Sequence, residues 1–342
     1  MSPPTPGTDQ SELLTPETVL DHLRDRGVIG TGPATARALS GGVSNVVLAV
    51  DAGDHRLVVK QSLGRLRVAD AWSAPRRRIV TEADALVVAA GLTPGAVPGV
   101  VDVDPVRFTL TVQRAPDTWI DWKRAILAGR VDPAVGDRLG SLLARWHALT
   151  ADQPRLTEPF AETTESFHCL RIRPYHETVA DRHPEVRPAV ERVVRRMLET
   201  RLVLVHGDLS PKNVLAGTGG LWVIDFEVAH LGDPAFDLAF LLSHLLMKAV
   251  HRPDLAGPLD AAGTGFLDRY RAGVPARLAP DLPYLSEQVG CLLLARVAGR
   301  SPAEYLTAAG RDGVWRLGRS LLDQPATDLA DLQRRRRVVV GR

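Results

Sequence analysis

Three oxygen-bearing side chains, two carboxylates and one carboxamide, follow one another closely in the second half of the chain. Asp208 comes after the apolar run 203–205, Asn213 stands five residues later, and Asp225 follows twelve residues after Asn213. In phosphoryl transfer, one carboxylate orients or deprotonates an attacking hydroxyl, while a carboxylate and a carboxamide hold magnesium on the nucleotide phosphates. Magnesium prefers hard oxygen ligands and keeps several waters, so one Asp and one Asn suffice. The residue types therefore predict phosphoryl-transfer chemistry.

Two apolar runs, 214–216 and 221–224, predict the strands that position these residues. The glycine-rich segment 217–220 separates the runs and supplies the positive-φ residues of a tight turn, so that the two strands form a hairpin. Such a hairpin brings Asn213 and Asp225 to the same end of two paired strands. The loop with the first carboxylate lies beside that end.

Two other interpretations of this segment stay open at this point. Asp and Asn are common turn residues, so the segment could be a loop with Asx turns, although this leaves the two apolar strands unexplained. His206 and Asp208 could instead bind a transition metal. The nearby sequence offers neither a Cys cluster nor a HExxH-type helix to complete such a site.

The motifs HGDLSPKN (206–213), IDFE (224–227) and GDPAFDLAF (232–240) resemble those of the aminoglycoside phosphotransferase and choline kinase family of small-molecule kinases. The resemblance covers about residues 36 to 310, and HGDxxxxN followed by IDFE is far more specific than a single glycine loop. It implies an α+β, protein-kinase-like fold with two lobes: a small β-rich N-lobe with one main helix and a larger, mostly helical C-lobe. It also implies ATP and Mg2+ as cofactors and a hydroxyl group of a small molecule as the acceptor.

The resemblance further implies a role for each residue of the catalytic segment. Asp208 is expected to be the catalytic base, Asn213 and Asp225 the metal ligands, and His206 and Asp237 the structural support of the catalytic loop.

Three positions in this segment depart from the pattern of protein kinases. Gly207 stands where those enzymes have Arg, and Glu227 stands where they have the Gly after Asp-Phe; both fit the small-molecule branch. Ser210 stands where protein kinases keep a phosphate-neutralising Lys. Lys212 lies in the same loop, and whether it reaches the phosphate stays open.

A glycine-rich turn between two apolar runs predicts a nucleotide clamp in the first third of the chain. The loop 39–45 precedes the strand 46–50, and the strand 57–60 runs back after a turn at 52–54. A glycine loop can lie over phosphates through its backbone N–H groups, although a Gly-Gly between strands is by itself most often an ordinary turn. With the resemblance, the expected nucleotide-binding residues are Gly41, Gly42, Ser44, Asn45, Lys60, Glu82, Gln113 and Ala115.

Lys60 ends the second of these strands, where a lone Lys is usually solvated. Glu82 lies in the predicted helix 77–90, which ends at Gly91. In the resembling fold, a strand Lys contacts the α and β phosphates and is held by a helix Glu, so we expect these two residues to pair. Asp84 is the alternative partner, but it points about 200° around the helix from Glu82.

The alternating segment 107–113 and the break at 114–117 match the hinge strand and the interlobe linker of the family. Backbone groups near Gln113 to Ala115 would hydrogen-bond an adenine. Any residue type provides such groups, so the purine preference comes from the resemblance. The expected organisation is a disordered leader at 1–11, an N-lobe with the nucleotide clamp at 12–115, and a C-lobe with the catalytic loop and the acceptor site at 116–342.

The composition narrows the possible partners. A chain of 342 residues with 45% apolar residues can bury two modest cores, and a net charge of +2 does not favour nucleic acid. No apolar run approaches a membrane span, and 235–247 is typical of a buried helix. The leader lacks the basic and the apolar region of a secretory signal. The two cysteines, Cys169 and Cys291, are far apart in the sequence, which suits a reducing cytosol. We therefore expect a cytoplasmic enzyme that binds neither nucleic acid nor membrane. Its oligomeric state stays open.

The acceptor is expected to contact the segment 156–188 and the C-terminal helices. Guanidinium groups recognise carboxylate or phosphate and repel ammonium groups, so Arg171, Arg173 and Tyr175 are predicted to contact a neutral or anionic acceptor rather than a polycation. The alternative is that this cluster, with its neighbouring histidines, decorates a solvent face. Residues 281–342 show no acidic excess for an aminoglycoside, and no aromatic cage for choline is evident.

Two other functions are compatible with these motifs: a nucleotide-binding pseudokinase that acts as an interaction module, and an antibiotic-inactivating aminoglycoside kinase. The complete set of Lys60, Asp208, Asn213 and Asp225 argues against a pseudokinase, because decay usually begins with the loss of one of these groups. A protein kinase fits less well, because no Ala-Pro-Glu element or long activation segment follows Asp225.

Overall fold

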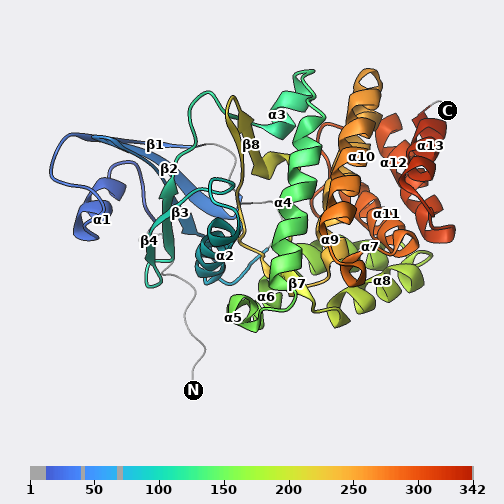
Figure 1. Ribbon diagram of the computed structural model, residues 1–342, viewed down its shortest axis with the longest axis horizontal. Coiled ribbons are helices and arrows are strands. Elements are labelled where there is room, and N and C mark those ends of the chain that lie inside the picture. The colour runs from blue at the N-terminus through green and yellow to red at the C-terminus, as the bar shows by residue number, and fades with distance from the viewer. Residues whose placement is uncertain (1–12, 40–42, 68–71, 341–342) are drawn as a thin grey trace.

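The computed structural model describes residues 13–39, 43–67 and 72–340 of the chain (Figure 1). The predicted leader and the expected loop residues Gly41 and Gly42 lie outside these ranges. The fold is α+β, with a small antiparallel sheet at one end of the molecule and a larger, mostly helical part at the other.

The N-terminal sheet has five antiparallel strands in the order β1-β2-β3-β5-β4. The β2–β3 turn contains Gly53, whose φ of 58° is a left-handed conformation that glycine adopts without strain. The helix α1 precedes the sheet, and α2 lies between β3 and β4. Their bounds are α1 (Val19–Asp25), β1 (Ala34–Ala38), β2 (Asn45–Ala52), β3 (His55–Ser62), α2 (Arg78–Leu92), β4 (Val100–Asp104) and β5 (Thr109–Gln113).

Side chains alternate between the two faces of β3. Leu57 and Val59 pack into a small core with α1, whereas Val58 packs against the core that includes α2. Because successive side chains of a strand point to opposite faces, α1 and α2 cover opposite sides of the sheet. The α2 core continues into the helical part, so the two lobes share one large apolar core. Each fully buried Leu or Val contributes about 1.5–3 kcal/mol to it.

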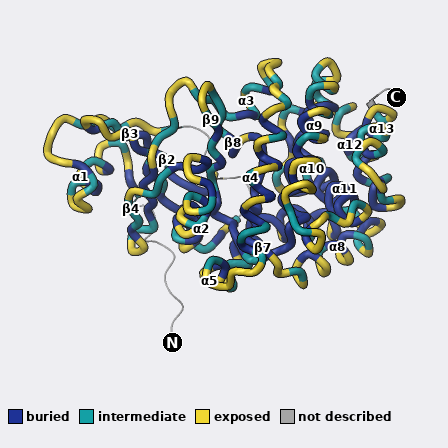
Figure 2. The backbone as a smooth tube through the Cα atoms, in the orientation of Figure 1, coloured by how far each residue is buried: buried dark blue, intermediate teal, exposed yellow. Residues whose placement is uncertain are grey.

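The helical part is built around α9 (Pro234–His251), in which every residue from Pro234 to Val250 is buried (Figure 2). The helix begins at Asp233, whose side chain accepts a hydrogen bond from the N–H of Ala235. The other helices are α3 (Trp122–Leu127), α4 (Ala134–Thr150), α5 (Pro154–Thr157), α6 (Thr164–Phe167), α7 (Thr178–Arg182), α8 (Arg187–Glu199), α10 (Ala256–Gly273), α11 (Leu282–Ala298), α12 (Ala308–Asp323) and α13 (Leu329–Val340).

Glycines bring α4 and α10 close together. A Cβ atom at Gly136 would lie 2.1 Å from the carbonyl oxygen of Ala262, and one at Gly140 would lie 2.2 Å from that of Phe266. Larger residues at these two positions would separate the helices.

Short elements complete the helical part and carry much of the site. They are β6 (Ile120–Asp121), β7 (Val203–Val205), β8 (Val214–Gly217), β9 (Gly220–Val223), β10 (His230–Gly232), the π-helix η2 (His168–Glu177) and the 3-10 turns η1 (Glu158–Phe160), η3 (Pro211–Asn213), η4 (Pro253–Leu255) and η5 (Ala276–Leu278).

The helices predicted at 77–90 and 235–247 are both present with small shifts at their ends. The strand expected from residue 107 begins two residues later, because Phe108 has a φ of 55° and belongs to the β4–β5 turn. None of the helices in the described ranges is both long and apolar enough to cross a membrane.

Candidate active site

The catalytic loop leaves β7, which pairs with β10, and turns sharply at Gly207. This residue has a φ of 77°, and a Cβ atom there would lie 2.8 Å from the carbonyl oxygen of Val228. A side chain would therefore strain the backbone and clash with a neighbouring chain segment. This explains why the Arg of protein kinases is absent from this position.

Two buried side chains hold the loop. The carboxylate of Asp237 on α9 accepts hydrogen bonds from the N–H groups of His206, at 2.7 Å, and Gly207, at 2.8 Å. The ring of His206 accepts a hydrogen bond from the N–H of Asp208 at its Nδ1, so its Nε2 donates to the carbonyl oxygen of Ile224, 3.1 Å away. Burial lowers the pKa of His206, in keeping with this neutral tautomer. The ring thereby joins the loop to the end of the hairpin.

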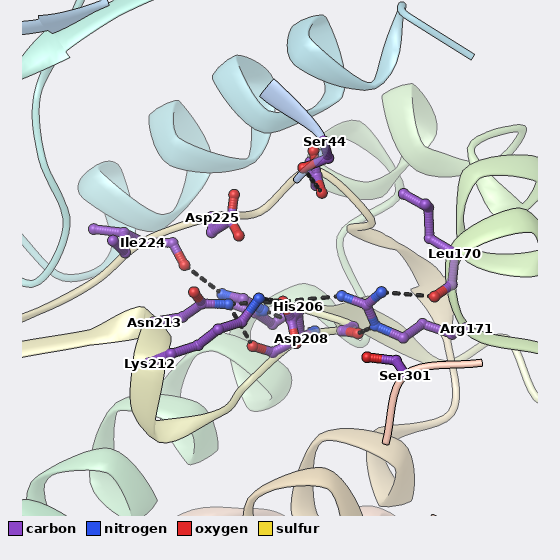
Figure 3. Close-up of polar contacts among 12 residues, drawn as sticks. Ser44, Leu170, Arg171, His206, Asp208, Lys212, Asn213, Ile224, Asp225 and Ser301 are labelled. Atoms are coloured by element: carbon purple, nitrogen blue, oxygen red, sulfur yellow. Dashed lines mark hydrogen bonds and ion pairs between the residues drawn. The ribbon is translucent and has the colours of Figure 1, made fainter. Parts of the chain in front are cut away.

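One oxygen of Asp208 receives three donors (Figure 3). Its Oδ2 lies 2.8 Å from Asn213 Nδ2, 2.9 Å from the guanidinium of Arg171 and 3.1 Å from Lys212 Nζ. Its Oδ1 accepts no hydrogen bond from any residue that the structure describes. The charge of Asp208 raises the pKa of Lys212. Burial opposes the charged form of Arg171, but Asp208 and the other acidic groups nearby together outweigh it and raise the pKa. Both cations therefore stay charged beside the carboxylate.

Asn213 and Asp225 lie at the same end of the β8–β9 hairpin. The N–H of Ile224 donates to the carbonyl oxygen of Asn213 at 3.0 Å, so the two chain segments are adjacent. Because the amide nitrogen of Asn213 donates to Asp208, its side-chain oxygen is directed elsewhere. Asp225 adopts a left-handed φ of 72°, a strained conformation of the kind that clusters at functional sites.

Lys60 bridges two carboxylates across the cleft. Its ammonium lies 2.6 Å from Glu82 on α2 and 2.7 Å from Asp225, whereas Asp84 is exposed on the same helix. Burial alone would lower the pKa of Lys60, but Asp225 and Glu82 outweigh it and raise the pKa. Burial likewise opposes the ionised form of Asp225, but the charges of Lys60 and Lys212 hold its pKa well below the ordinary value. Lys60 and Asp225 are therefore both charged.

A second buried network joins the lobes next to the glycine-rich loop. Glu227 accepts hydrogen bonds from the hydroxyl of Ser44 at 2.9 Å, from the amide of Asn45 at 3.0 Å and from Arg78 Nε at 3.1 Å. Arg78 is 1% exposed and also donates to the carbonyl oxygen of Leu63, 2.9 Å away. Ser44 and Asn45 thus contact Glu227 with their side chains. The sequence did not reveal that Arg78, which lies within the predicted helix 77–90, joins the two lobes through Glu227.

The hinge region leaves one of the expected backbone donors open. The N–H of Gln113 donates to the carbonyl oxygen of Gly99 at 2.9 Å, and that of Arg114 donates to the carbonyl oxygen of Arg56 at 2.8 Å. The N–H of Ala115 finds no acceptor within the described part of the chain. Among the N–H groups from Gln113 to Ala115, that of Ala115 is therefore open to a ligand, and adenine binding by backbone groups of this segment stays a prediction.

The three residues expected to contact the acceptor are separated by the π-helix η2. Arg171 is buried, donates to the carbonyl oxygens of Gly207 and Leu170, and holds Asp208, so its donors serve the catalytic loop. Arg173 is 59% exposed, lies 3.9 Å from Glu177, and does not reach the cavity beside Asp208. Residues two apart on a helix do not share a face, which separates Arg173 from Arg171, and a contact of Arg173 with the acceptor stays an untested prediction. Tyr175 is buried and does line the cavity.

A cavity of about 260 Å³ lies between Asp208 and the C-terminal helices. Lys248 and His244 of α9, together with Arg296 of α11 and Tyr305, line it, and the sequence interpretation gave none of them a role. One feature of the sequence could have found Lys248. The chain has 38 arginines but only four lysines. Lys60 binds Asp225. The other three lysines, at 123, 212 and 248, all line this cavity.

Comparison with known proteins places these residues in a family. The model of the phosphotransferase enzyme family matches residues 35–280. The chain belongs to this family. Methylthioribose kinase of Yersinia pseudotuberculosis (strain YPIII) is 27% identical over 274 residues, which are 71% of this chain and 67% of the relative. Methylthioribose kinase of Exiguobacterium sibiricum is 27% identical over 270 residues, 70% of this chain and 67% of the relative.

Two solved structures share the fold of this chain. Spectinomycin phosphotransferase, in complex with ADP and spectinomycin, has a TM-score of 0.52 at 14% identity and covers 96% of this chain and 97% of its own. Amicoumacin kinase, in complex with AMP-PNP and Ca2+, has a TM-score of 0.52 at 14% identity and covers 92% and 96%. The chain is therefore a small-molecule kinase with a protein-kinase-like fold, as its motifs predict.

Proposed function

We propose that this kinase transfers the γ-phosphate of ATP to a hydroxyl group of a small molecule, with Asp208 as the base. The hydroxyl proton moves to Asp208 Oδ1 while the hydroxyl oxygen bonds to the γ-phosphorus. The bond from that phosphorus to the bridging oxygen of ADP breaks in line. The observation that carries the proposal is the asymmetry of the carboxylate: three donors hold Oδ2, and Oδ1 remains to accept a proton.

We further propose that Asn213 and Asp225 hold the Mg2+ of the nucleotide. The side-chain oxygens of a carboxamide and an ionised carboxylate are the hard ligands that this ion prefers. In the described ranges no three His, Cys, Asp or Glu residues form a metal-binding group, which suits an ion whose remaining ligands are water and phosphate oxygens. When bound, Mg2+ would neutralise charge on the β and γ phosphates.

Lys60 is proposed to hold the α and β phosphates. Its ammonium contacts both Glu82 and Asp225. Phosphate oxygens would replace Asp225 as its partner as that carboxylate turns to the ion, while Glu82 keeps the ammonium in place. The N–H of Ala115 would bind the adenine. In this proposal residues 12–115 form the nucleotide clamp, and 116–342 carry the catalytic loop and the acceptor site.

The similarity to methylthioribose kinases favours a sugar-like alcohol as the acceptor. The cavity of about 260 Å³ lies below the roughly 300–1,000 Å³ of sites for drug-sized ligands, which favours a small metabolite over a large antibiotic. We also propose a cytoplasmic location, where ATP is abundant and where the free thiols of Cys169 and Cys291 remain reduced.

Transfer of labelled γ-phosphate to a metabolite pool tests the proposal. We expect label on a small alcohol with the wild-type enzyme and transfer at least about 100-fold slower with Asp208→Asn, because a general base is lost. ATP binding should persist in this variant. Near-normal transfer by Asp208→Asn would remove Asp208 from the role of base.

A further inference from the structure

The cavity beside Asp208 is rich in positive charge. Among the described residues that line it, the acidic ones already have cationic or polar partners. Asp208 is bound by Arg171 and Lys212, Glu227 by Arg78, and Glu304 by Lys123 at 2.7 Å. The basic residues that line the cavity outnumber them: Lys123, Arg171, Lys212, Lys248, Arg296 and Arg300, against Asp208, Glu227 and Glu304.

Lys248 is the most unusual of these cations. It is 1% exposed, and its ammonium forms neither a hydrogen bond nor an ion pair with any residue that the structure describes. Its ammonium makes a cation–π contact with the ring of Tyr305, whose centroid lies 5.3 Å away. Burial, together with the charges of Lys123 and Arg296, lowers the pKa of Lys248 to about 7. A buried amine without an acceptor is costly, and a bound anion would relieve that cost.

Other polar atoms around Lys248 are also without partners. His244 lies one turn before it on α9 and is 9% exposed, and its Nδ1 has no partner within the described ranges. Arg296 Nε and the hydroxyl of Tyr305 also have no hydrogen-bond partner within the described ranges. Another nitrogen of Arg296 donates to the hydroxyl of Ser301 at 2.7 Å. Buried polar groups normally have partners, so four such groups around one cavity point to a ligand that supplies acceptors.

One apolar cluster also lines the cavity. Leu66 and Trp72 from the N-lobe and Leu170 from η2 line it. A ligand can therefore place its carbon skeleton against these side chains, one end at the cations and its hydroxyl at Asp208.

We propose that the acceptor alcohol carries an anionic group, a carboxylate or a phosphate, which binds to Lys248, His244 and Arg296. This inference rests on the proposed function of Asp208, because it names the class of molecule whose hydroxyl that residue deprotonates. Ammonium-bearing acceptors are disfavoured, because like charges would meet in a buried site.

A series of sugars that differ at one end tests the inference: D-ribose, methylthioribose, D-ribonate and D-ribose 5-phosphate. We expect kcat/KM for one of the anionic sugars to exceed that of both neutral sugars at least about tenfold, because hydrogen bonds between charged groups are strong. Lys248→Met should raise KM for the anionic sugar by about the same factor and leave KM for ATP unchanged. Arg336→Met is the matched control, and it should leave both KM values unchanged. It removes another buried cation, which pairs with Asp260 between α13 and α10 and does not line the cavity.

Binding of anions separates this inference from the function of Asp208, because binding requires no phosphoryl transfer. With the nucleotide site saturated by AMP-PNP and Mg2+, calorimetry should detect saturable binding of inorganic phosphate or malonate, weakened at least about tenfold in Lys248→Met and in His244→Phe. Preference for phosphate or for malonate identifies the anionic group. Three outcomes would each overturn the inference and leave the kinase function intact. Both anions could fail to bind, neutral and anionic sugars could be used equally, or both variants could bind the anions as the wild type does.

Discussion

Two lysines face the interlobe cleft, Lys60 partly buried and Lys248 fully buried, and their surroundings are opposite. Lys60 contacts two carboxylates at 2.6 and 2.7 Å, which raise its pKa despite burial. Lys248 has no carboxylate partner in the described structure, and burial with neighbouring cations lowers its pKa to about 7. The protein thus neutralises one ammonium with its own residues and leaves the other for a ligand to neutralise. On our proposals, the nucleotide binds at the first lysine and the anionic end of the acceptor at the second.

The largest effect is expected when Lys60 is removed. Lys60→Met would leave the buried carboxylate of Glu82 without its cation, and removing one partner of a buried pair costs about 3–5 kcal/mol of stability. Chemical denaturation measures this loss. Lys123→Met is the control, because its pair with Glu304 is largely exposed and should contribute less than about 1 kcal/mol. Equal losses in the two variants would contradict the contrast between the buried and the exposed pair.

The partner of Lys60 can be tested without removing the lysine. Glu82→Gln should raise KM for ATP about tenfold or more, because a charged hydrogen bond worth about 1.5–3 kcal/mol no longer holds the ammonium. Steady-state kinetics measures this change. Asp84→Asn, an equivalent change at an exposed position of the same helix, should leave KM for ATP unchanged. Similar kinetics of the two variants would remove Glu82 from this role.

Lys248→Met should have the opposite effect on stability. The change removes an unpaired buried amine and keeps a side chain of similar length, so the free energy of unfolding should rise by about 1–3 kcal/mol. Denaturant titration at neutral pH measures the gain. Destabilisation by Lys248→Met would mean that Lys248 has a stabilising partner, and the comparison of the two lysines would fail.

The finest test is the pH dependence of that gain, which appears as a slope and not as a change at one pH. In the unfolded chain a lysine has a pKa of about 10.4, so between about pH 7 and pH 10 the unfolded state binds one more proton than the folded state. Wild-type stability should therefore rise with pH relative to Lys248→Met, by at most about 1.4 kcal/mol per pH unit. The difference between the two proteins isolates Lys248 from the groups that face it, namely His244, Lys123, Arg296, Glu304 and Asp121. Parallel stability curves would show that Lys248 titrates normally.

Local sequence was sufficient for the catalytic segment. Asp208, Asn213 and Asp225 lie within 18 residues, separated only by a short loop and a hairpin whose turn the glycines specify. Spacing of this kind predicts which side chains converge, because strand pairing over a tight turn leaves few alternatives. The pairing of Lys60 with Glu82 was also predictable, since helix geometry directs Glu82 and Asp84 to different sides.

The acceptor cavity could not be derived in this way, because its residues come from separate helices. Arg171 and Arg173 are neighbours in sequence, yet the π-helix turns one toward Asp208 and the other toward solvent. Lys248 and Arg296 line one cavity only because α9 and α11 pack together, and no carboxylate of the described residues pairs with the ammonium of Lys248. The sequence alone thus determined that the chain is a small-molecule kinase and which side chains of the segment 208–225 converge, since the convergence depends on local geometry. Only the tertiary structure decided which charges are buried without a partner, because burial and pairing depend on contacts between distant segments.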